Sequence, residues 1–374
     1  MLTRQPAEIG MAVEAVDTPA LLLDIDILDR NLKQMADAAD QAGVRLRPHA
    51  KSHKCPNIAL KQMALGAVGV CCQKVSEAEA MVEGGIRNVL VTYEIVGEPK
   101  VLRLASLARH AQVSVITDHL DQVMAYSRAA SELGVTLSVM VDVYVGGPRT
   151  GVEPGGQILD LAQQIAVAPG LKFGGLQAYN GAAQHIRDCT ERRTAYAVYA
   201  DKVNKTKELL EDNGISCETI SGAGTGTYMW EAGSGIFTEL QPGSYIFMDA
   251  DYATNLDEDG RLWQGFENSL FILTTVMNCR ARDYAIVDAG TKAANIDTAM
   301  PLVYKHTGII YEATGDEHGK LELAPEAAPL RLGEKLRLIP GHCDPTVNLY
   351  DWIVCIRDDT VEAIWPVSGR GAVL

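Results

Sequence analysis

Four short stretches of this chain carry residue types that can do chemistry together. The first covers residues 47–54 (RPHAKSHK), which follow an apolar run and present amines and imidazoles close together. A lysine at such a position, Lys51, can be partly desolvated, which lowers its pKa and prepares its amine for a Schiff base. A solvated basic loop, or a loop that binds an anion, is the alternative for the same residues.

The second stretch is a turn of small residues at 221–227 (SGAGTGT). Small side chains let backbone N–H groups approach a phosphate closely, and the hydroxyl groups add further donors. The turn matches neither a Walker A loop nor a GxGxxG fingerprint, so an ordinary glycine-rich turn remains the alternative. Its place after a predicted seventh barrel strand favours phosphate binding.

The third stretch, residues 340–346 (PGHCDPT), contains His342 and Asp344. In an extended segment, side chains two residues apart point to the same side. An imidazole and a carboxylate, completed by water or substrate oxygens, suit a divalent metal ion in an open site. A hydrogen-bonded histidine–aspartate pair is the alternative.

The fourth stretch, residues 177–181 (QAYNG), ends a predicted strand and is followed by His185. Tyr179 is expected to face the mouth of a barrel. A histidine in the following loop can act as a general base near neutral pH, although a solvated histidine would look the same in the sequence.

The elements that position these stretches alternate between short apolar runs and helix-length amphipathic segments. Such alternation predicts a parallel sheet, and eight units in this length favour a closed (β/α)8 barrel over an open doubly wound sheet. We expect the barrel to cover residues 20–250. The predicted strands are 44–48, 68–72, 88–92, 113–117, 137–142, 173–179, 218–221 and 244–248.

The remainder of the chain has a different texture. Helical periodicity fades after about residue 260, and strand-like runs separated by Gly, Pro and Asp follow. This pattern predicts a mainly antiparallel β domain from residues 251–374, together with residues 1–19. The segment 255–265 is the predicted linker or surface loop.

Composition excludes several classes of function. The chain has 374 residues and a net charge of -15, which argues against nucleic acid and against an anionic membrane surface. We see neither a signal peptide nor an apolar stretch long enough to span a membrane, so we expect a cytoplasmic protein. The eight cysteines are scattered and are expected to be reduced thiols.

These motifs resemble the D-threonine aldolase and D-3-hydroxyaspartate aldolase family. The resemblance covers residues 17–371 almost continuously, and its long, specific blocks are 47–54, 70–78, 239–249 and 340–346. It implies the alanine-racemase-like fold, fold type III of the pyridoxal-phosphate (PLP) enzymes. Such proteins combine a barrel with a C-terminal β domain and commonly form a homodimer.

The resemblance also implies roles for individual residues. Lys51 matches the lysine that holds PLP, and His342 and Asp344 match the ligands of a divalent ion, typically manganese or magnesium. His185 matches the base on the substrate hydroxyl. The expected cofactor contacts are Lys51, Gln73, Arg149, Tyr179, Gly222, Gly224, Thr225 and Tyr245.

One loop departs from the family pattern. The family usually has a compact Gly-x-Gly-Arg-Cys-Gly turn after the fifth strand, whereas residues 142–151 (DVYVGGPRTG) are longer and place Thr150 where cysteine is usual. The placement of Arg149 and the substrate preference therefore depend on this loop.

The expected reaction is retro-aldol cleavage of a D-β-hydroxy-α-amino acid such as D-threonine, D-allo-threonine or D-3-hydroxyaspartate, giving glycine and an aldehyde. A dehydratase of the same fold, acting on D-serine or D-threo-3-hydroxyaspartate, is the main alternative. Related dehydratases pair His with Cys, which suits zinc, whereas Asp344 suits a harder ion. A PLP carrier without catalysis would resemble the barrel alone, and a racemase would need no metal pair.

Overall fold

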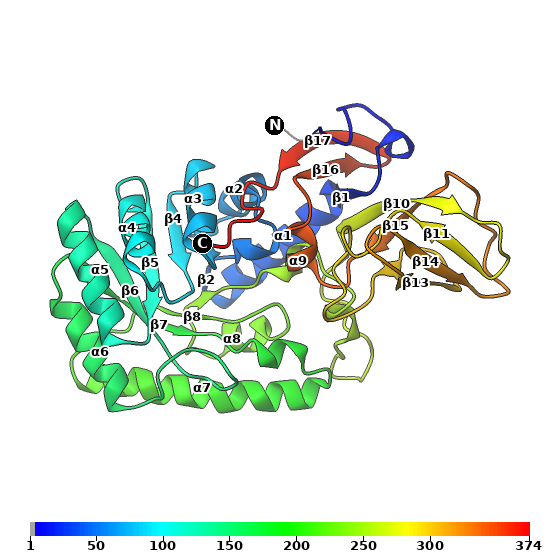
Figure 1. Ribbon diagram of the computed structural model, residues 1–374. Helices are drawn as coiled ribbons and strands as arrows, with labels where there is room; N and C mark the ends of the chain where they lie inside the picture. The colour runs from blue at the N-terminus through cyan, green and yellow to red at the C-terminus, as the bar shows by residue number, and fades with distance from the viewer. Residues whose placement is uncertain (1–3) are drawn as a thin grey trace.

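A parallel β-sheet closed into a barrel forms the larger part of the molecule (Figure 1). The computed structural model describes residues 4–374, and within them eight parallel strands run in the order β2-β9-β8-β7-β6-β5-β4-β3. A parallel bridge between His49 and Cys71 joins the two ends of the sheet. The predicted barrel is confirmed. Its strands are β2 (Arg45–Leu46), β3 (Val70–Cys72), β4 (Asn88–Val91), β5 (Gln112–Thr117), β6 (Leu137–Asp142), β7 (Leu171–Ala178), β8 (Ile220–Gly222) and β9 (Glu239–Leu240).

Helices surround the barrel, with α4 to α7 visible along its left and lower sides in Figure 1. The first of them begins where the side chain of Asp24 accepts a hydrogen bond from the N–H of Ile27, and ends at Gly43, whose φ is 68°. None of the helices in residues 4–374 is long and apolar enough to cross a membrane. The helices of the barrel are α1 (Ile25–Ala42), α2 (Pro56–Ala64), α3 (Val75–Glu83), α4 (Glu98–Leu107), α5 (Leu120–Leu133), α6 (Gly156–Val167), α7 (Cys189–Asp212) and α8 (Tyr228–Gly233).

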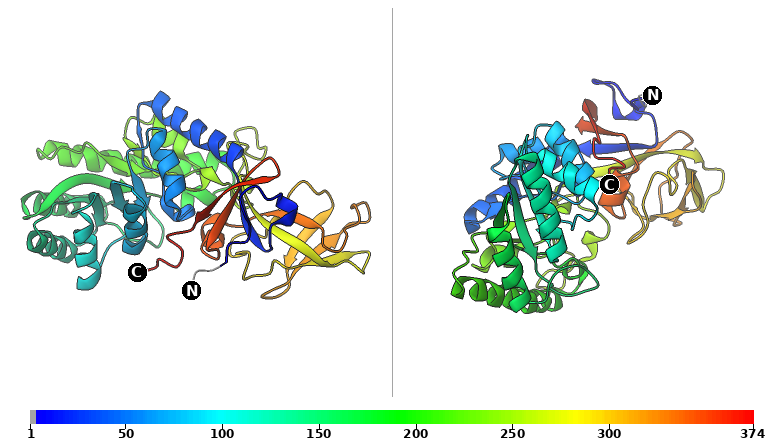
Figure 2. Two further views of the ribbon diagram at one scale, coloured as in Figure 1. Left: turned by 90° about the horizontal axis from the view of Figure 1, so that it is seen from above. Right: turned by 60° about the vertical axis from the view of Figure 1, so that its left-hand side comes forward.

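A second sheet lies beside the barrel and gives the molecule its elongated outline (Figure 2). Its strands follow the order β13-β14-β11-β10-β1-β16-β17, and β15 pairs with both β10 and β12. All pairs are antiparallel except β1 with β16, as expected for a mainly antiparallel β domain. The strands are β1 (Ala20–Asp24), β10 (Leu270–Asn278), β11 (Tyr284–Val287), β12 (Leu302–Val303), β13 (Ile309–Ala313), β14 (Gly319–Leu323), β15 (Lys335–Ile339), β16 (Trp352–Arg357) and β17 (Thr360–Pro366).

Two segments differ from the sequence-based expectation. The predicted eighth strand at 244–248 is wrong, because Ser244–Ile246 forms a 3-10 helix and the eighth strand is β9. Residues 20–24, included in the expected barrel range, form β1 of the second sheet. The first described strand therefore belongs to the β domain, the next eight form the barrel, and the remaining strands belong to the β domain again.

Charged residues fill part of the barrel interior. Arg47 is 9% exposed, and its Nε donates to Glu239 at 2.8 Å while its Nη1 donates to Asn88 at 2.7 Å. Glu239 also accepts from the hydroxyl of Ser221 at 2.7 Å. A buried ion pair is tolerated when hydrogen bonds satisfy both partners, as they do here. Arg47 thus belongs to the interior and not to the basic loop that follows it.

Short helical turns bring the two sheets together at the barrel mouth. After β2 the chain forms η2 (Ala50–Ser52), and after β7 it forms η3 (Ala182–His185). The β domain contributes α9 (Cys343–Val347), which packs against η2. The segment that leaves the barrel, residues 249–252, lies alongside: the N–H of Ala250 donates to Pro340 O at 2.9 Å. The candidate site forms at this junction.

Candidate active site at the barrel mouth

Lys51 meets Asp344 across the junction. The Nζ of Lys51 lies 3.2 Å from the Oδ2 of Asp344, and the lysine side chain is 39% exposed. The carboxylate of Asp344 raises the pKa of Lys51, although burial opposes it. The ion pair with Asp344 thus shifts the pKa of Lys51 upward, opposite to the lowered pKa that was expected. An amine from the barrel and a carboxylate from the β domain form an ion pair where the sequence predicted chemistry.

The two predicted metal ligands lie at the start of α9 and do not share one extended segment as expected. His342 is the residue before the helix and Asp344 lies in its first turn. The Nδ1 of His342 faces Asp297 at 3.2 Å. Burial alone would raise the pKa of Asp344, but the nearby charges of Lys51 and His342 outweigh it, so the pKa is lowered and the group stays ionised.

One oxygen of Asp344 is available for a ligand. Its Oδ1 is buried and has no hydrogen-bond partner among residues 4–374. An unpaired buried carboxylate oxygen is costly, and a metal ion is one way to satisfy it. Among the same residues, no group of three or more His, Cys, Asp or Glu side chains is arranged to hold a metal. The donor set fits an open site with two protein ligands.

Arg149 and Tyr179 lie together at the mouth. The guanidinium of Arg149 sits 5.3 Å from the centre of the Tyr179 ring. Both contribute to the electrostatic environment of Lys51: Tyr179 raises the pKa of the lysine and Arg149 lowers it. The longer loop thus still delivers Arg149 to the neighbourhood of the amine.

Two acidic groups, Asp142 and Asp118, anchor the loop that carries Arg149. The hydroxyl of Thr150 donates to Asp142 at 3.1 Å, and the N–H of Gly151 donates to Asp118 at 3.2 Å. Burial raises the pKa of Asp142, and the adjacent carboxyl of Glu94 raises it further. Sequence analysis noted Thr150 only as a departure from the family pattern. In the structure its hydroxyl fixes the loop to the end of β6.

His49 and Gln73 support the lysine from the barrel side. The Nδ1 of His49 accepts the N–H of Lys51 at 3.3 Å, while its Nε2 lies 3.2 Å from Gln73 Oε1 and 3.0 Å from the hydroxyl of Thr92. Burial and the charge of Lys51 lower the pKa of His49 to about 3. His49 is therefore a neutral positioning group. Gln73, a predicted cofactor contact, is held beside it.

The small-residue turn after β8 has a backbone suited to an anion. Ala223 has a φ of 71°, which is uncommon for a residue other than glycine. A left-handed residue of this kind can be part of a nest, in which successive N–H groups point to one side toward an anion. Packing also requires the glycines, because a Cβ at Gly222 would lie 2.2 Å from Ala178 O and one at Gly224 would lie 2.5 Å from Gln184.

Two other predicted cofactor contacts, Thr225 and Tyr245, already have hydrogen-bond partners within the protein. The hydroxyl of Thr225 accepts the N–H of Tyr245 at 3.0 Å. The ring of Tyr245 is fully buried against Phe266, and its hydroxyl accepts from Gln62 at 3.1 Å. Tyr245 therefore buttresses the turn from behind.

His185 is held by a partner that sequence analysis missed. Its Nδ1 lies 2.7 Å from the Oδ2 of Asp251, and its side chain is 47% exposed. Asp251 also accepts from Arg187. Burial would raise the pKa of Asp251, but the hydrogen bonds from His185 and Arg187 outweigh it and lower the pKa to about 2. The separation of 66 residues gave no local signal for this pairing.

Tyr252 links the histidine to the rest of the cluster. Its ring lies 6.0 Å from that of His185. Burial raises the pKa of Tyr252, and Tyr179 and Asp344 are among the nearby groups that raise it further. The amine, the carboxylate, the Arg149–Tyr179 pair and the histidine therefore surround one region.

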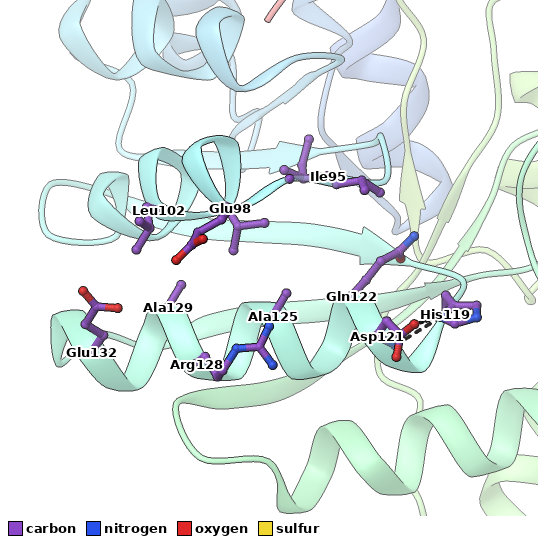
Figure 3. A pocket seen from close by; sticks show the side chains of 13 residues that line it. Ile95, Glu98, Leu102, His119, Asp121, Gln122, Ala125, Arg128, Ala129 and Glu132 are labelled. Carbon is purple, nitrogen blue, oxygen red and sulfur yellow. Dashed lines mark hydrogen bonds and ion pairs between the residues drawn. The ribbon is translucent and has the colours of Figure 1, made fainter.

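A cavity of about 680 Å³ lies elsewhere, between α4 and α5 (Figure 3). Its lining includes Ile95, Leu102, Gln122 and Arg128 but none of the predicted site residues. Volume alone would direct attention to this groove. The ion pair of Lys51 with Asp344, and the buried unpaired oxygen of Asp344, make the barrel mouth the candidate site instead.

Comparison with known families agrees with this architecture. Residues 23–251 match the family model described as alanine racemase, N-terminal domain, and residues 269–356 match a putative serine dehydratase domain. The barrel, the β domain and the lysine at their junction define an alanine-racemase-like enzyme of fold type III.

The individual proteins that this chain resembles include aldolases of D-β-hydroxy-α-amino acids. The chain is 46% identical over 366 residues to a D-threonine aldolase from Arthrobacter sp., covering 98% of this chain and 96% of that protein. It is 44% identical over 370 residues to a 3-hydroxy-D-aspartate aldolase from Paracoccus denitrificans, covering 98% and 95%. A crystal structure of D-threonine aldolase from Filomicrobium marinum superposes with a TM-score of 0.95 at 48% identity, covering 99% and 100%.

The chain belongs to the family of D-threonine aldolase and 3-hydroxy-D-aspartate aldolase, and it is a lyase. The D-threo-3-hydroxyaspartate dehydratase of Delftia sp. is more distant, at 27% identity over 361 residues, covering 88% and 92%. The dehydratase alternative is therefore not favoured.

Proposed function

We propose that the protein cleaves D-β-hydroxy-α-amino acids, such as D-threonine, D-allo-threonine or D-3-hydroxyaspartate, to glycine and an aldehyde, using PLP and a divalent metal ion. The observation that carries the proposal is the meeting of Lys51 and Asp344 at 3.2 Å, with the second oxygen of Asp344 left unpaired. This contact supports the proposal that an amine able to bind the cofactor lies beside a carboxylate able to take a ligand.

Lys51 would hold PLP, and the small-residue turn at 221–227 would receive its phosphate. When bound, PLP supplies an electron sink for the carbanion that remains at Cα after the bond to Cβ breaks. His49 keeps the backbone of Lys51 in place, and its neutral ring adds no charge beneath the amine. Arg149, stacked near Tyr179, supplies a fixed positive charge at the mouth.

His342 and Asp344 would hold the divalent ion, manganese or magnesium by the hardness of the carboxylate. Such an ion supplies Lewis-acid polarisation of a substrate oxygen. His185, half-exposed and backed by Asp251, is the group of this chain that can take the proton of the β-hydroxyl. We also propose that the protein is a homodimer, and that the division near residue 250 separates a PLP-binding barrel from a β domain that supplies the metal ligands.

A panel of D- and L-β-hydroxy amino acids, assayed with PLP and manganese, tests this function. We expect glycine and an aldehyde in equal amounts from the D-substrates. A keto acid and ammonia would identify a dehydratase instead. PLP binding without turnover of any member of the panel would favour a carrier.

A further inference from the structure

A buried acidic residue faces the predicted base. The side chain of Asp251 is 5% exposed, and each of its carboxylate oxygens has a different partner. Oδ2 meets the Nδ1 of His185 at 2.7 Å, and Oδ1 accepts from the Nη2 of Arg187. Because its pKa is lowered to about 2, Asp251 is ionised at neutral pH and can only accept hydrogen bonds.

We propose that Asp251 is a positioning residue that fixes the tautomer of His185. A carboxylate only accepts, so the Nδ1 that faces it carries the proton, and in the neutral ring Nε2 is then the unprotonated nitrogen. Nε2 is then the nitrogen that can receive a proton from substrate. The inference rests on the proposed role of His185 and adds the group that makes that role possible.

The contacts of Arg187 determine how an asparagine at position 251 would orient its amide. Its guanidinium donates to the Oδ1 of Asp251, to the carbonyl O of Asp251 at 2.9 Å and to the Oδ1 of Asn255 at 2.9 Å. The guanidinium has only donors, so the atom of residue 251 that faces it must be an acceptor. An asparagine at 251 would therefore turn its oxygen to Arg187 and its NH₂ to His185. The Nδ1 of His185 would become an acceptor, and its proton would move to Nε2.

The backbone around Asp251 ties the histidine to the predicted metal turn. The N–H of Asp251 donates to Gly341 O at 3.2 Å. Two residues earlier, Asp249 accepts the N–H of Cys343 at 3.0 Å and the N–H of Tyr252 at 3.0 Å. The segment 249–252 thus contacts the residues on both sides of His342, and the side chain of Asp251 within it holds His185. Residues 249–252 therefore set the position of His185 relative to the turn that carries His342.

The test compares Asp251→Asn with the double variant Asp251→Asn/Arg187→Met. Histidine labelled with ¹⁵N in the ring reports which nitrogen carries the proton, independently of catalysis. The chain has eight histidines, and the signal lost in His185→Gln assigns the one of interest. Arg187→Met alone and the exposed Asp259→Asn serve as controls, and both should keep the proton on Nδ1.

We expect Asp251→Asn to move the proton to Nε2 and to lower kcat by about a hundredfold or more, the scale of general-base catalysis. In the double variant the amide is free to turn its oxygen toward His185, so the proton returns to Nδ1 and part of kcat is recovered. If Asp251→Asn does not fold, Asp251→Ala replaces it, and its His185 ring should show both neutral tautomers.

An unchanged tautomer in a folded Asp251→Asn variant would overturn the proposal, whatever happens to kcat. Loss of kcat without recovery in the double variant, despite a restored tautomer, would also count against it. A changed tautomer with unchanged kcat would leave Asp251 as the positioning group and instead refute His185 as the base.

Discussion

Glu231 is a fully buried carboxyl group that supports the small-residue turn from below. Its Oε1 accepts hydrogen bonds from the hydroxyls of Tyr199 and Thr227, the latter at 2.8 Å. Its Oε2 is buried without a partner among the described residues. Burial raises the pKa of Glu231 to about 7 from its ordinary value of 4.5. The folded protein therefore binds this proton more tightly than the unfolded chain.

The sign of the resulting pH dependence follows directly. Between pH 4.5 and 7 the folded state keeps the proton and the unfolded state loses it, so the free energy of unfolding falls as pH rises. The contribution is complete below 4.5 and is lost above 7. At about 1.4 kcal/mol per pH unit, the total amounts to about 3 kcal/mol.

Glu231→Gln removes this term because an amide does not ionise. We expect the stability difference between variant and wild type to change by about 3 kcal/mol in favour of the variant between pH 4.5 and 8. Urea unfolding at several pH values measures it, with the neighbouring Trp230 as a fluorescent reporter. The exposed Glu132→Gln is the matched control and should show no such change. A stability difference that stays constant across this range would refute the reasoning.

Three further predictions concern the proposed chemistry. Lys51→Ala should lose both activity and the borohydride-trapped pyridoxyl peptide, and trapping at another lysine would disprove the assignment. Chelation should abolish cleavage while leaving the PLP absorbance largely intact, and added manganese should restore cleavage. Asp344→Asn should weaken manganese binding at least tenfold, because substitution of residues that merely hydrogen-bond to a metal ligand already costs about that much. An enzyme indifferent to exhaustive chelation would show that the metal has no part in the reaction. D-threonine and D-allo-threonine should both react, whereas L-threonine should react about a thousandfold more slowly or not at all, because its hydroxyl would point away from His342 and Asp344; comparable rates on L- and D-threonine would contradict this.

The barrel was predictable because its strands are short apolar runs separated by amphipathic helices. The eighth strand was missed for a physical reason: β9 consists of Glu239 and Leu240, and a charged residue does not read as a buried strand position. Glu239 is an interior residue because distant partners satisfy it, among them Arg47, 192 residues away, and Ser221. The more apolar run at 244–248 was chosen instead.

The assignment of residues 20–24 failed in a related way. The run Ala20–Asp24 is almost wholly buried, as a parallel barrel strand would be. Its actual partners are β10 and β16, which lie more than 240 residues further along the chain. A buried strand does not encode which sheet it joins, because burial on both faces looks alike in either place.

The site divides between residues with a local signal and residues without one. Lys51, His185, His342 and Asp344 stand in motifs that mark them as candidates, and the resemblance to the aldolase family implies their roles. Asp251 is an ordinary acidic residue in sequence, and only the fold brings it to His185. Partners of this kind are selected by tertiary contacts, so no reading of spacing along the chain would have found them.

Asp251 and Asp344 show how the same side chain serves two purposes at one junction. Both oxygens of Asp251 have partners, His185 and Arg187, so its carboxylate holds these two neighbours in place. Asp344 spends one oxygen on Lys51 and keeps the other buried and unpaired. Because an unsatisfied buried oxygen costs free energy, the unpaired oxygen of Asp344 supports the proposed ligand at this carboxylate. The two carboxylates therefore suit different proposed roles: Asp251 positions its neighbours, and Asp344 is the proposed ligand.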